Sequence, residues 1–436
     1  MSGQNLTKNE QSLAQENSAL RNEISILKEQ LALLQEQLDW LKKQVFGRKT
    51  EQTSVIMDGG TQLSLFPAEM EQAVSVPEKT ITVPEHQRKA NHTDDIEKCN
   101  IRCAAYPQPM IPHSFCSPEL AAHIVYEKFA KAVPLYRQEK DFNSKGVPLL
   151  RATMSDWVCI VAEQWCLPVY EKMSVLLIAG NIIHADESVL QVLHEEGRKA
   201  TTDSRMWVYC NGKMNDRSVI IFEYQQTRGG IHPARFLKGF TGFLICDGYD
   251  AYNAVTGTKR CGCWTHTRRY FVEALPKDKF AYSTSVAAKA VNFCDMIYHE
   301  EGLLAKLTAE ERYKLRLVKV KPLLDAFFLW LDAQNISGKG KLAKAVGYAL
   351  NEKQYLYTFL DDGNVPIDNN RAENAIRPFA IGRKNWLFNN TERGAKCSAI
   401  LYSIISTAQA NGLDAEKYLT ELFSQPTGTI LLPWKI

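Results

Sequence analysis

Several features that would indicate particular protein classes are missing from this 436-residue chain. No apolar run reaches the roughly 18 residues that a membrane-spanning helix needs, and the polar start has no apolar segment typical of a secretory signal. The net charge is only +3, so charge alone does not indicate a nucleic-acid-binding protein. The eleven cysteines are scattered, which favours reduced thiols over a disulfide framework. We therefore expect a cytoplasmic globular protein without a membrane partner.

Proline and glycine are also missing from residues 6–45, where leucine recurs every seven residues. The repeated positions are Leu6, Leu13, Leu20, Leu27, Leu34 and Leu41. Asn17 falls on the other core position of the heptad, which favours a parallel dimer in register. A single amphipathic helix packed on its own domain is the alternative, but the narrow, sustained stripe favours a coiled coil. We predict a dimerisation helix over residues 5–46 and hence a homodimer.

Residues 47–115 differ in texture, since prolines and polar residues dominate and no period is clear. We interpret them as a linker or a small irregular module. Cys99 and Cys103 form one loose pair. A structural zinc site normally has four well-spaced ligands, usually as two tight pairs, so at most a remnant of such a site is expected here.

A small helical domain is predicted over residues 116–178, which opens on a typical helix start at Ser117 and Pro118. Helices are expected over 118–131, 134–143 and 153–165, with a break at Gly146. This order is typical of a helix-turn-helix, in which case Arg151 and Thr153 lie near the start of the recognition helix and contact DNA. Packing helices of a scaffold are an equally good interpretation.

From residue 179 the pattern changes to strands. Short β-rich runs cover 181–185, 206–210, 219–224, 242–246 and 261–264. Helices are expected over 233–237 and 265–275, and the stretch 283–360 reads as mostly helical. The chain closes with a helical segment over 396–436. The sequence therefore predicts a mixed α/β fold in the second half of the chain.

The amide- and arginine-rich segment 367–384 contains a single glutamate, Glu373. If the segment is helical, Asn370, Glu373, Asn374 and Arg377 share one face. One interpretation is a carboxylate that binds a metal beside residues that bind phosphate. The alternative is a solvated helix capped by Asp368, and the segment taken alone favours that alternative.

Two aspartates are predicted at strand ends, Asp186 after the first strand and Asp247 after the fourth. In a ribonuclease-H-like fold these strands are adjacent, so both side chains reach one rim, and a later helix can bring Glu373 beside them. Three carboxylates suit two Mg²⁺ or Mn²⁺ ions, which support in-line phosphoryl displacement. Both aspartates can equally be turn residues, and Asp250 and Glu223 are competing acids.

Seven segments together resemble the insertion sequence 66 family of bacterial transposases. They are FGRKTE at 46–51, SPELAAHIVYEKFAKAVPLYRQEKDF at 117–142, HADES at 184–188, CDGYDAYN at 246–253, CWTHTRRYF at 263–271, DNNRAENAIRPFAIGRKNW at 368–386 and LYSIISTAQANGLDAEKYL at 401–419. The resemblance runs in order from residue 46 onward, and the glutamate-bearing block is its most specific part. Similar members usually carry a Cys-rich, zinc-ribbon-like module before the SPEL segment, which is shortened or lost here.

The resemblance implies a DDE-type transposase whose catalytic and metal-binding residues are Asp186, Asp247 and Glu373, with two Mg²⁺ or Mn²⁺ ions. It implies a ribonuclease-H-like catalytic core over residues 179–395 with an all-helical insertion at about 283–360. The implied partners are DNA, as the terminal inverted repeats of the element and the target, and accessory proteins that the element encodes. A bacterial protein of this kind associates with the nucleoid when it is bound to DNA.

Basic residues near these motifs are candidates for phosphate contacts, although solvated surface charge is an equal alternative for each. They are Arg268, Arg269, Arg377, Arg383 and Lys384. Cys263 and His266 match a C-x-x-H motif, to which the resemblance gives a structural or substrate-positioning role. Two ligands do not complete a zinc site, so Zn²⁺ is not expected.

Two other functions stay open on the sequence. The first is a regulatory DNA-binding protein that descends from a transposase, has no catalytic activity and dimerises through the coiled coil. The second is a host nuclease of the same fold, which would cut DNA without joining strands.

Overall fold

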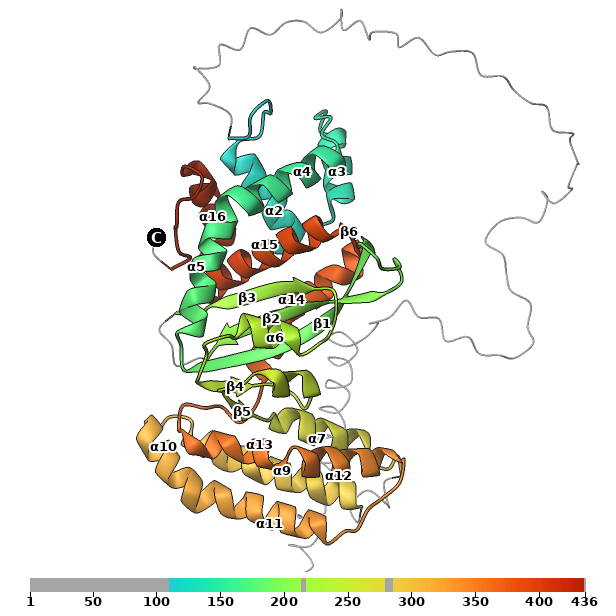
Figure 1. Cartoon of the computed structure of the whole chain (residues 1–436), viewed down its shortest axis with the longest axis vertical. Coiled ribbons are helices and arrows are strands. Elements are labelled where there is room, and N and C mark those ends of the chain that lie inside the picture. Colours follow the sequence, from blue (N-terminus) through green and yellow to red (C-terminus); the bar gives the residue numbers. More distant parts are fainter. Residues whose placement is uncertain (1–109, 213–216, 279–284, 435–436) are drawn as a thin grey trace, which may run out of the picture. The chain divides into compact units, whose positions relative to one another are not determined.

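The computed structural model describes residues 110–212, 217–278 and 285–434 (Figure 1). These residues belong to one compact unit, Cys99–Ile436. The predicted coiled coil and most of the predicted linker lie outside the described residues, so both stay predictions. Among the described helices, none combines the length and the hydrophobicity that crossing a membrane requires.

A mixed β-sheet with the strand order β3-β2-β1-β4-β5 lies within this unit. Its strands are β1 (Ile182–His194), β2 (Asp203–Asn211), β3 (Ile220–Gln225), β4 (Phe243–Ile245), β5 (Lys259–Cys261) and β6 (Asn389–Thr391). β1, β2 and β3 are antiparallel neighbours, whereas β4 pairs with β1, and β5 with β4, in parallel. β6 pairs in parallel with the far end of β1. The mixed α/β fold that the sequence predicts is therefore present.

The first strand is longer than expected. The predicted end after Ala185 was wrong, because pairing with β2 continues as far as Gln191 and carries β1 to His194. What does stop near Asp186 is the pairing with β4, whose last register pair is His184 with Ile245. Asp186 and Asp247 therefore each lie two residues beyond the last paired position on neighbouring parallel strands. The two aspartates thus follow neighbouring paired positions as predicted, although β1 itself does not end there.

A first group of helices precedes the sheet. It comprises α2 (Pro118–Phe129), α3 (Leu135–Ser144), α4 (Arg151–Val161), a π turn (Ala162–Cys166) and α5 (Leu167–Ile178). Gly146 has a φ of 77°, which a residue with a side chain rarely adopts, and it breaks the helical pattern as predicted. The third helix does not end at residue 165. The helix continues through the π turn into α5. Pro168 has no N–H to donate to the Gln164 carbonyl four residues earlier, and this carbonyl accepts a hydrogen bond from the Gly428 N–H instead.

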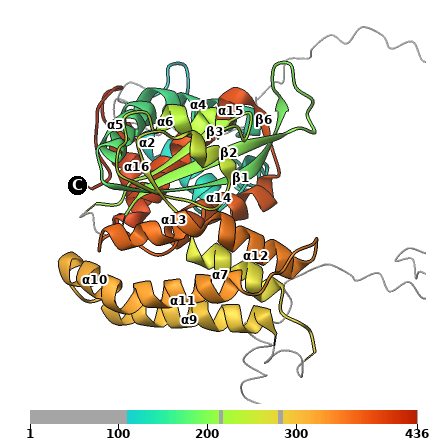
Figure 2. The same cartoon turned by 60° about the horizontal axis from the view of Figure 1, so that its bottom comes forward.

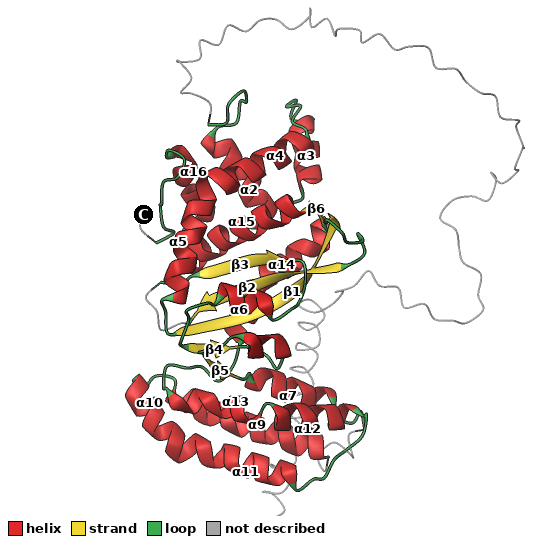
Figure 3. Ribbon diagram, in the orientation of Figure 1, coloured by secondary structure: helices red, strands yellow, loops and turns green. Residues whose placement is uncertain are grey.

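The remaining helices follow the strands. They are α6 (Ile231–Phe236), α7 (Trp264–Glu273), α9 (Val286–Leu304), α10 (Ala309–Leu315), α11 (Lys321–Asp332), α12 (Lys341–Asn351), α13 (Lys353–Tyr357), α14 (Asn370–Trp386), α15 (Glu392–Ala410) and α16 (Ala415–Ser424). The strand expected over 261–264 is shifted, since β5 ends at Cys261 and Trp264 already begins α7. Helices α7 and α9 to α13 gather beyond β5, while α15 packs along β3 (Figures 2 and 3).

Two buried clusters stabilise the unit. The sheet core joins α2–α5, β1–β3 and α14–α16, and the ring of Tyr402 lies 5.5 Å from the rings of both Phe222 and Phe379 at its centre. The helical core joins α7 with α9–α13 around Trp264 and Phe327. β4 lies between them, because Leu244 belongs to the sheet core and Ile245 to the helical core. The strand that precedes Asp247 is thus shared by both cores.

Candidate active site

Asp186 lies on the face of the sheet that α14 covers. Successive side chains of a strand point to opposite faces, so its neighbour Glu187 points the other way. There the Glu187 carboxylate accepts hydrogen bonds of 2.7 Å from Arg228 Nε and from the Tyr252 hydroxyl. Glu187 is therefore committed to an ion pair, and Asp186 is the acid of this pair that faces α14.

The surroundings of Asp186 raise the pKa of its carboxyl. Burial, and then the negative charges of Glu187, Asp247 and Glu373, raise the pKa of Asp186 to about 8. Asp247 follows the strand next to β1, and the start of α14, which bears Glu373, is bonded to Ala185, the residue before Asp186. A divalent cation would offset the repulsion among these carboxylates and release the proton.

Asp247 begins a loop that charged and aromatic residues hold in place. Arg260 Nη2, on β5, donates to the Asp247 carbonyl at 2.9 Å and to Glu352 Oε2 at 2.8 Å. The Gly248 N–H donates to the Tyr348 hydroxyl at 3.2 Å. A Cβ at Gly248 would lie 2.5 Å from the ring of Tyr348, so only glycine fits against this ring. Tyr348 and Glu352 belong to the region of α12, which means that the helical core fixes this loop.

Glu373 occupies the first turn of α14, whose start is tied down by Asn369. Asn369 is 1% exposed and makes three hydrogen bonds that join separate segments. Its Nδ2 donates to the Ala185 carbonyl at 2.8 Å, its Oδ1 lies 3.1 Å from His184 Nδ1, and its backbone N–H donates to Cys263 Sγ at 3.2 Å. The side chain of Asn369 thus holds the start of α14 against β1, beside Asp186. Its backbone N–H holds the same turn against the start of α7.

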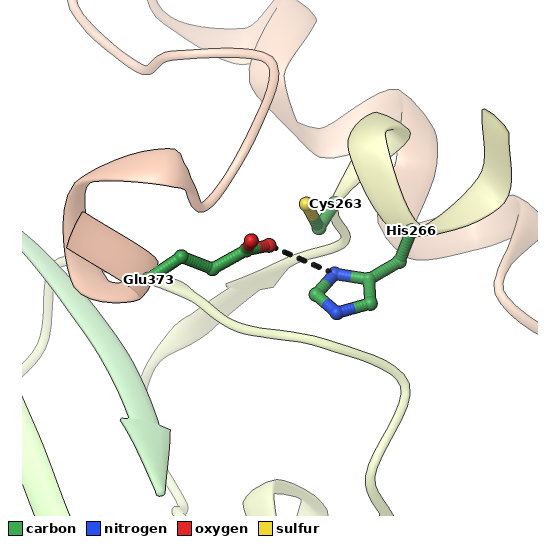
Figure 4. A group of neighbouring side chains, drawn as sticks. All are labelled: Cys263, His266 and Glu373. Carbon is green, nitrogen blue, oxygen red and sulfur yellow. Dashed lines mark ion pairs between the residues drawn. The ribbon is translucent and has the colours of Figure 1, made fainter. Parts of the chain in front are cut away.

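The Glu373 carboxylate faces α7 (Figure 4). Arg269 Nη2 donates to Oε2 at 2.9 Å, and His266 Nδ1 lies 3.6 Å from Oε1. Both Oε1 and this Nδ1 are buried and have no hydrogen-bond partner among the described residues. The ligand atoms of Cys263, His266 and Glu373 all lie within 4.8 Å of one another, and neither aspartate belongs to this group. Sequence reasoning found the Cys263 and His266 motif but missed that Glu373 completes it.

The structure also places the predicted phosphate-binding residues. Arg268 donates to Asp295 at 2.7 Å, and Arg269 is paired with Glu373. Arg383 donates to the Ser188 hydroxyl and to the Val189 carbonyl, next to Asp186 on β1. These three guanidinium groups therefore have partners within the chain. Two further candidates on α14, Arg377 and Lys384, are exposed, and their contact with DNA stays a prediction.

Arg151 and Thr153 lie in the first turn of α4, as the helix-turn-helix prediction requires. Arg151 is exposed, and its guanidinium lies 5.7 Å from the centre of the Tyr136 ring. Thr153 is half-buried. Their role in DNA binding stays a prediction.

Comparisons with known proteins identify the family of the chain. Residues 113–397 match the family described as "Transposase IS66 family", and residues 33–96 match one described as "Transposase C of IS166 homeodomain". These matches define the class of the protein as a transposase. The chain belongs to the Transposase IS66 family, so the resemblance seen in its sequence segments is confirmed.

Similar proteins occur in Sinorhizobium fredii (strain NBRC 101917 / NGR234). The protein y4hP is 29% identical over 86% of this chain and 72% of its own length. The protein y4qI is 31% identical over 76% of this chain and 65% of its own length. Among solved structures, the Drosophila P element transposase strand transfer complex aligns with a TM-score of 0.38 and 10% identity, over 67% of this chain and 92% of that chain.

Proposed function

We propose that the chain is a DDE-type DNA transposase that binds the ends of its mobile element as a homodimer. It hydrolyses a phosphodiester bond at each end and then joins the released 3′-hydroxyl to target DNA. Membership of a transposase family supports the reaction class. The observation that carries the catalytic part is geometric: Asp186 and Asp247 each lie two residues beyond the last paired position of two neighbouring parallel strands, and Asn369 holds the start of α14, which bears Glu373, against the first of these strands.

The topology supports a ribonuclease-H-like core. Three antiparallel strands are followed by two parallel strands on the other side of β1, which makes β1 and β4 neighbours. Helices α9–α13 then fall between β5 and α14 in the chain, where the family resemblance implies an insertion. This arrangement would let two strands and one late helix supply the three acids.

The residues at this place fit hard divalent cations. Carboxylate oxygens are the ligands that Mg²⁺ and Mn²⁺ prefer, and Asp186, Asp247 and Glu373 would hold them. Bound ions of this kind would activate the attacking water or 3′-hydroxyl and stabilise the leaving oxygen.

The chain's own residues would prepare this chemistry. The protonated carboxyl of Asp186 reduces the charge of the metal-free site, and Asn369 fixes the distance between α14 and β1. Arg269 is 47% exposed, so its guanidinium can contact a DNA phosphate while one nitrogen still bonds Glu373. Arg377 and Lys384 offer exposed positive charge on the same helix.

Replacement of Asp247 by Asn tests the catalytic assignment. We expect Mg²⁺-dependent cleavage of element-end DNA to fall by about 1,000-fold or more, because one metal ligand loses its charge, while DNA binding in a mobility-shift assay is kept. The matched control is Asp250→Asn, since Asp250 is an exposed acid of the same loop. Cleavage at the wild-type rate in Asp247→Asn would overturn the assignment. Cleavage without strand joining would favour a nuclease, and DNA binding without cleavage by the wild-type chain would favour a regulatory protein.

A further inference from the structure

We propose that Cys263, His266 and Glu373 form a second cation site, one that takes a Zn²⁺-type ion and competes for Glu373 with the carboxylate site. The competition rests on the proposed function, whereas the binding itself does not. Cys263 immediately precedes α7, His266 lies in the first turn of α7, and Glu373 lies in the first turn of α14. Two helix starts, distant in sequence, therefore bring three different donor types together (Figure 4).

The spacing of the donors suits a small tetrahedral ion. Zinc bonds to nitrogen and oxygen measure about 2.0 Å, so the tetrahedral edge between two such ligands is roughly 3.3 Å. His266 Nδ1 and Glu373 Oε1 lie 3.6 Å apart, and all three ligand atoms lie within 4.8 Å of one another. The spacing of His266 Nδ1 and Glu373 Oε1 exceeds this edge by only a few tenths of an ångström, so small side-chain shifts would bring these two donors onto one ion, with Cys263 as the third ligand and water in the fourth position.

Two of the three donor atoms make no hydrogen bond to the described residues. Within the part of the chain that the structure describes, His266 Nδ1 and Glu373 Oε1 are buried without a hydrogen-bond partner, and a buried polar atom in that state costs about 1–3 kcal/mol. They face each other, and a cation between them would satisfy both. The second oxygen of Glu373 is already taken by Arg269, so Oε1 is the oxygen that points to this site.

The third donor makes the site selective. Cys263 Sγ is fully buried and accepts the Asn369 N–H at 3.2 Å, a contact that in metal sites helps to orient a thiolate. Sulfur and imidazole ligands favour Zn²⁺ strongly over Mg²⁺. A set of three protein ligands with an open fourth position is typical of catalytic zinc sites, whereas structural sites use four protein ligands. The sequence offered only two of these ligands, and the fold supplies the third.

One carboxylate oxygen cannot serve both sites. If Glu373 Oε1 binds an ion beside Cys263 and His266, it is withdrawn from the ions that Asp186 and Asp247 would hold. A thiophilic ion at this place should therefore inhibit Mg²⁺-dependent cleavage, although it never contacts DNA. The same glutamate would make the catalytic site responsive to zinc.

Binding is tested with Co²⁺, whose thiolate charge-transfer absorption reports a cysteine ligand. The full chain carries Cys99→Ser and Cys103→Ser, so that this loose pair cannot contribute. We expect a thiolate band at one ion per chain and competition by Zn²⁺. Cys263→Ser should abolish the band and weaken Zn²⁺ binding by at least about 100-fold, and Glu373→Gln should weaken it by about 10-fold or more. A band of wild-type strength in Cys263→Ser, or no band in the parent chain, would overturn the site.

The matched control is Cys261→Ser, because Cys261 is equally buried two residues earlier but is not among the donors. Its band should match that of the parent, and urea unfolding should show that both serine variants are folded. Competition is then measured as Mg²⁺-dependent cleavage with increasing Zn²⁺. Zinc should inhibit the parent and Cys261→Ser, but not Cys263→Ser, whatever its absolute rate. Equal inhibition of all three would refute the sharing of Glu373, and if no chain cleaves DNA, the proposed function fails while the cobalt spectra still decide the site.

Discussion

The edge strand β3 and the helical core satisfy their buried polar groups by different means. Along β3, hydroxyls of α15 serve the strand: Ser403 Oγ accepts the Phe222 N–H at 2.7 Å and Thr407 Oγ1 accepts the Ile220 N–H at 3.0 Å. The helical core instead contains the buried ion pairs of Arg316 with Glu301 and Arg260 with Glu352. Neutral hydroxyls thus complete the edge strand β3, whereas charged pairs join α9 to the turn before α11 and β5 to the end of α12.

The same contrast extends to the proposed acids. A neutral amide, Asn369, fixes α14 and therefore Glu373 against the strand of Asp186. A charged chain, Arg260 to Glu352, fixes the loop of Asp247. One acid of the proposed site, Asp247, therefore depends on the helical core for its position.

The largest effect is expected from Arg316→Met, which breaks the helical core. The Arg316 side chain is 2% exposed, and it bonds both oxygens of Glu301, at 2.9 and 2.8 Å, as well as two backbone carbonyls. Removing it leaves a buried carboxylate unpaired, so the free energy of unfolding should fall by about 3–5 kcal/mol.

Urea unfolding measures this loss. Lys314→Met is the matched control, since Lys314 makes a 2.7 Å ion pair with Glu310 at the surface. It should cost no more than about 0.5 kcal/mol. Similar losses in both variants would contradict the distinction between buried and exposed pairs in this region.

Asn369→Leu tests the neutral link of the sheet core. The side chain is of similar size but leaves the Ala185 carbonyl and His184 without their present bonds, so stability should fall by about 2–3 kcal/mol. Cleavage should fall by roughly 100-fold, because a small displacement of α14 moves Glu373. Asn374→Leu is the control, as Asn374 is exposed on the same helix, and it should leave cleavage and unfolding close to wild type. Unchanged cleavage in Asn369→Leu would show that the amide does not position Glu373.

Glu352→Gln tests the charged link. The amide oxygen still accepts a hydrogen bond from Arg260 but carries no charge, so the free energy of unfolding should fall by only about 1–2 kcal/mol. Cleavage should fall by about 10-fold, since the Asp247 loop is less firmly held. Glu310→Gln, at an exposed acid of the same helical region, should have no effect on cleavage. If both variants cleave equally, the helical core does not position Asp247.

A last effect concerns pH in the absence of divalent ions. Folding raises the pKa of Asp186 to about 8, so the folded chain holds a proton that the unfolded chain releases near pH 4. This contribution to stability is complete below the unfolded pKa and is lost as pH rises through about 8. The thermal midpoint should therefore fall by roughly a few degrees between pH 5 and 8. Asp186→Asn should flatten that slope and Asp250→Asn should keep it, and an identical slope in both variants would contradict the raised pKa.

Much of the fold could be predicted from local patterns. Ser117 and Pro118 do begin a helix, Gly146 does break one, and Asp247 does follow a strand, because caps, left-handed glycines and strand ends leave marks in adjacent residues. The length of β1 could not be predicted in this way. Its continuation past Asp186 depends on pairing with β2, which is a property of the fold.

The candidate site was predictable in its residue types but not in its pairings. The sequence singled out Glu373 and Cys263 separately, and only the packing of α14 against α7 shows that they share a site. Arg269 and Arg383 looked like DNA contacts because a charge in a motif carries no sign of its partner. Their pairing with Glu373 and with β1 depends on segments far away in the chain.

Both ends of α14 are attached to the same strand. At its start, Asn369 bonds Ala185 of β1, and just after its end, β6 pairs Asn389 with Val192 and Thr391 with His194. Because both ends are held, α14 cannot rotate about one end while the other stays fixed. A DNA strand that pressed on the exposed Arg377 and Lys384 would therefore move helix and strand as one body. Any exchange of Glu373 between two sets of partners must then come from torsions of its own side chain, which are fast compared with the motion of whole elements.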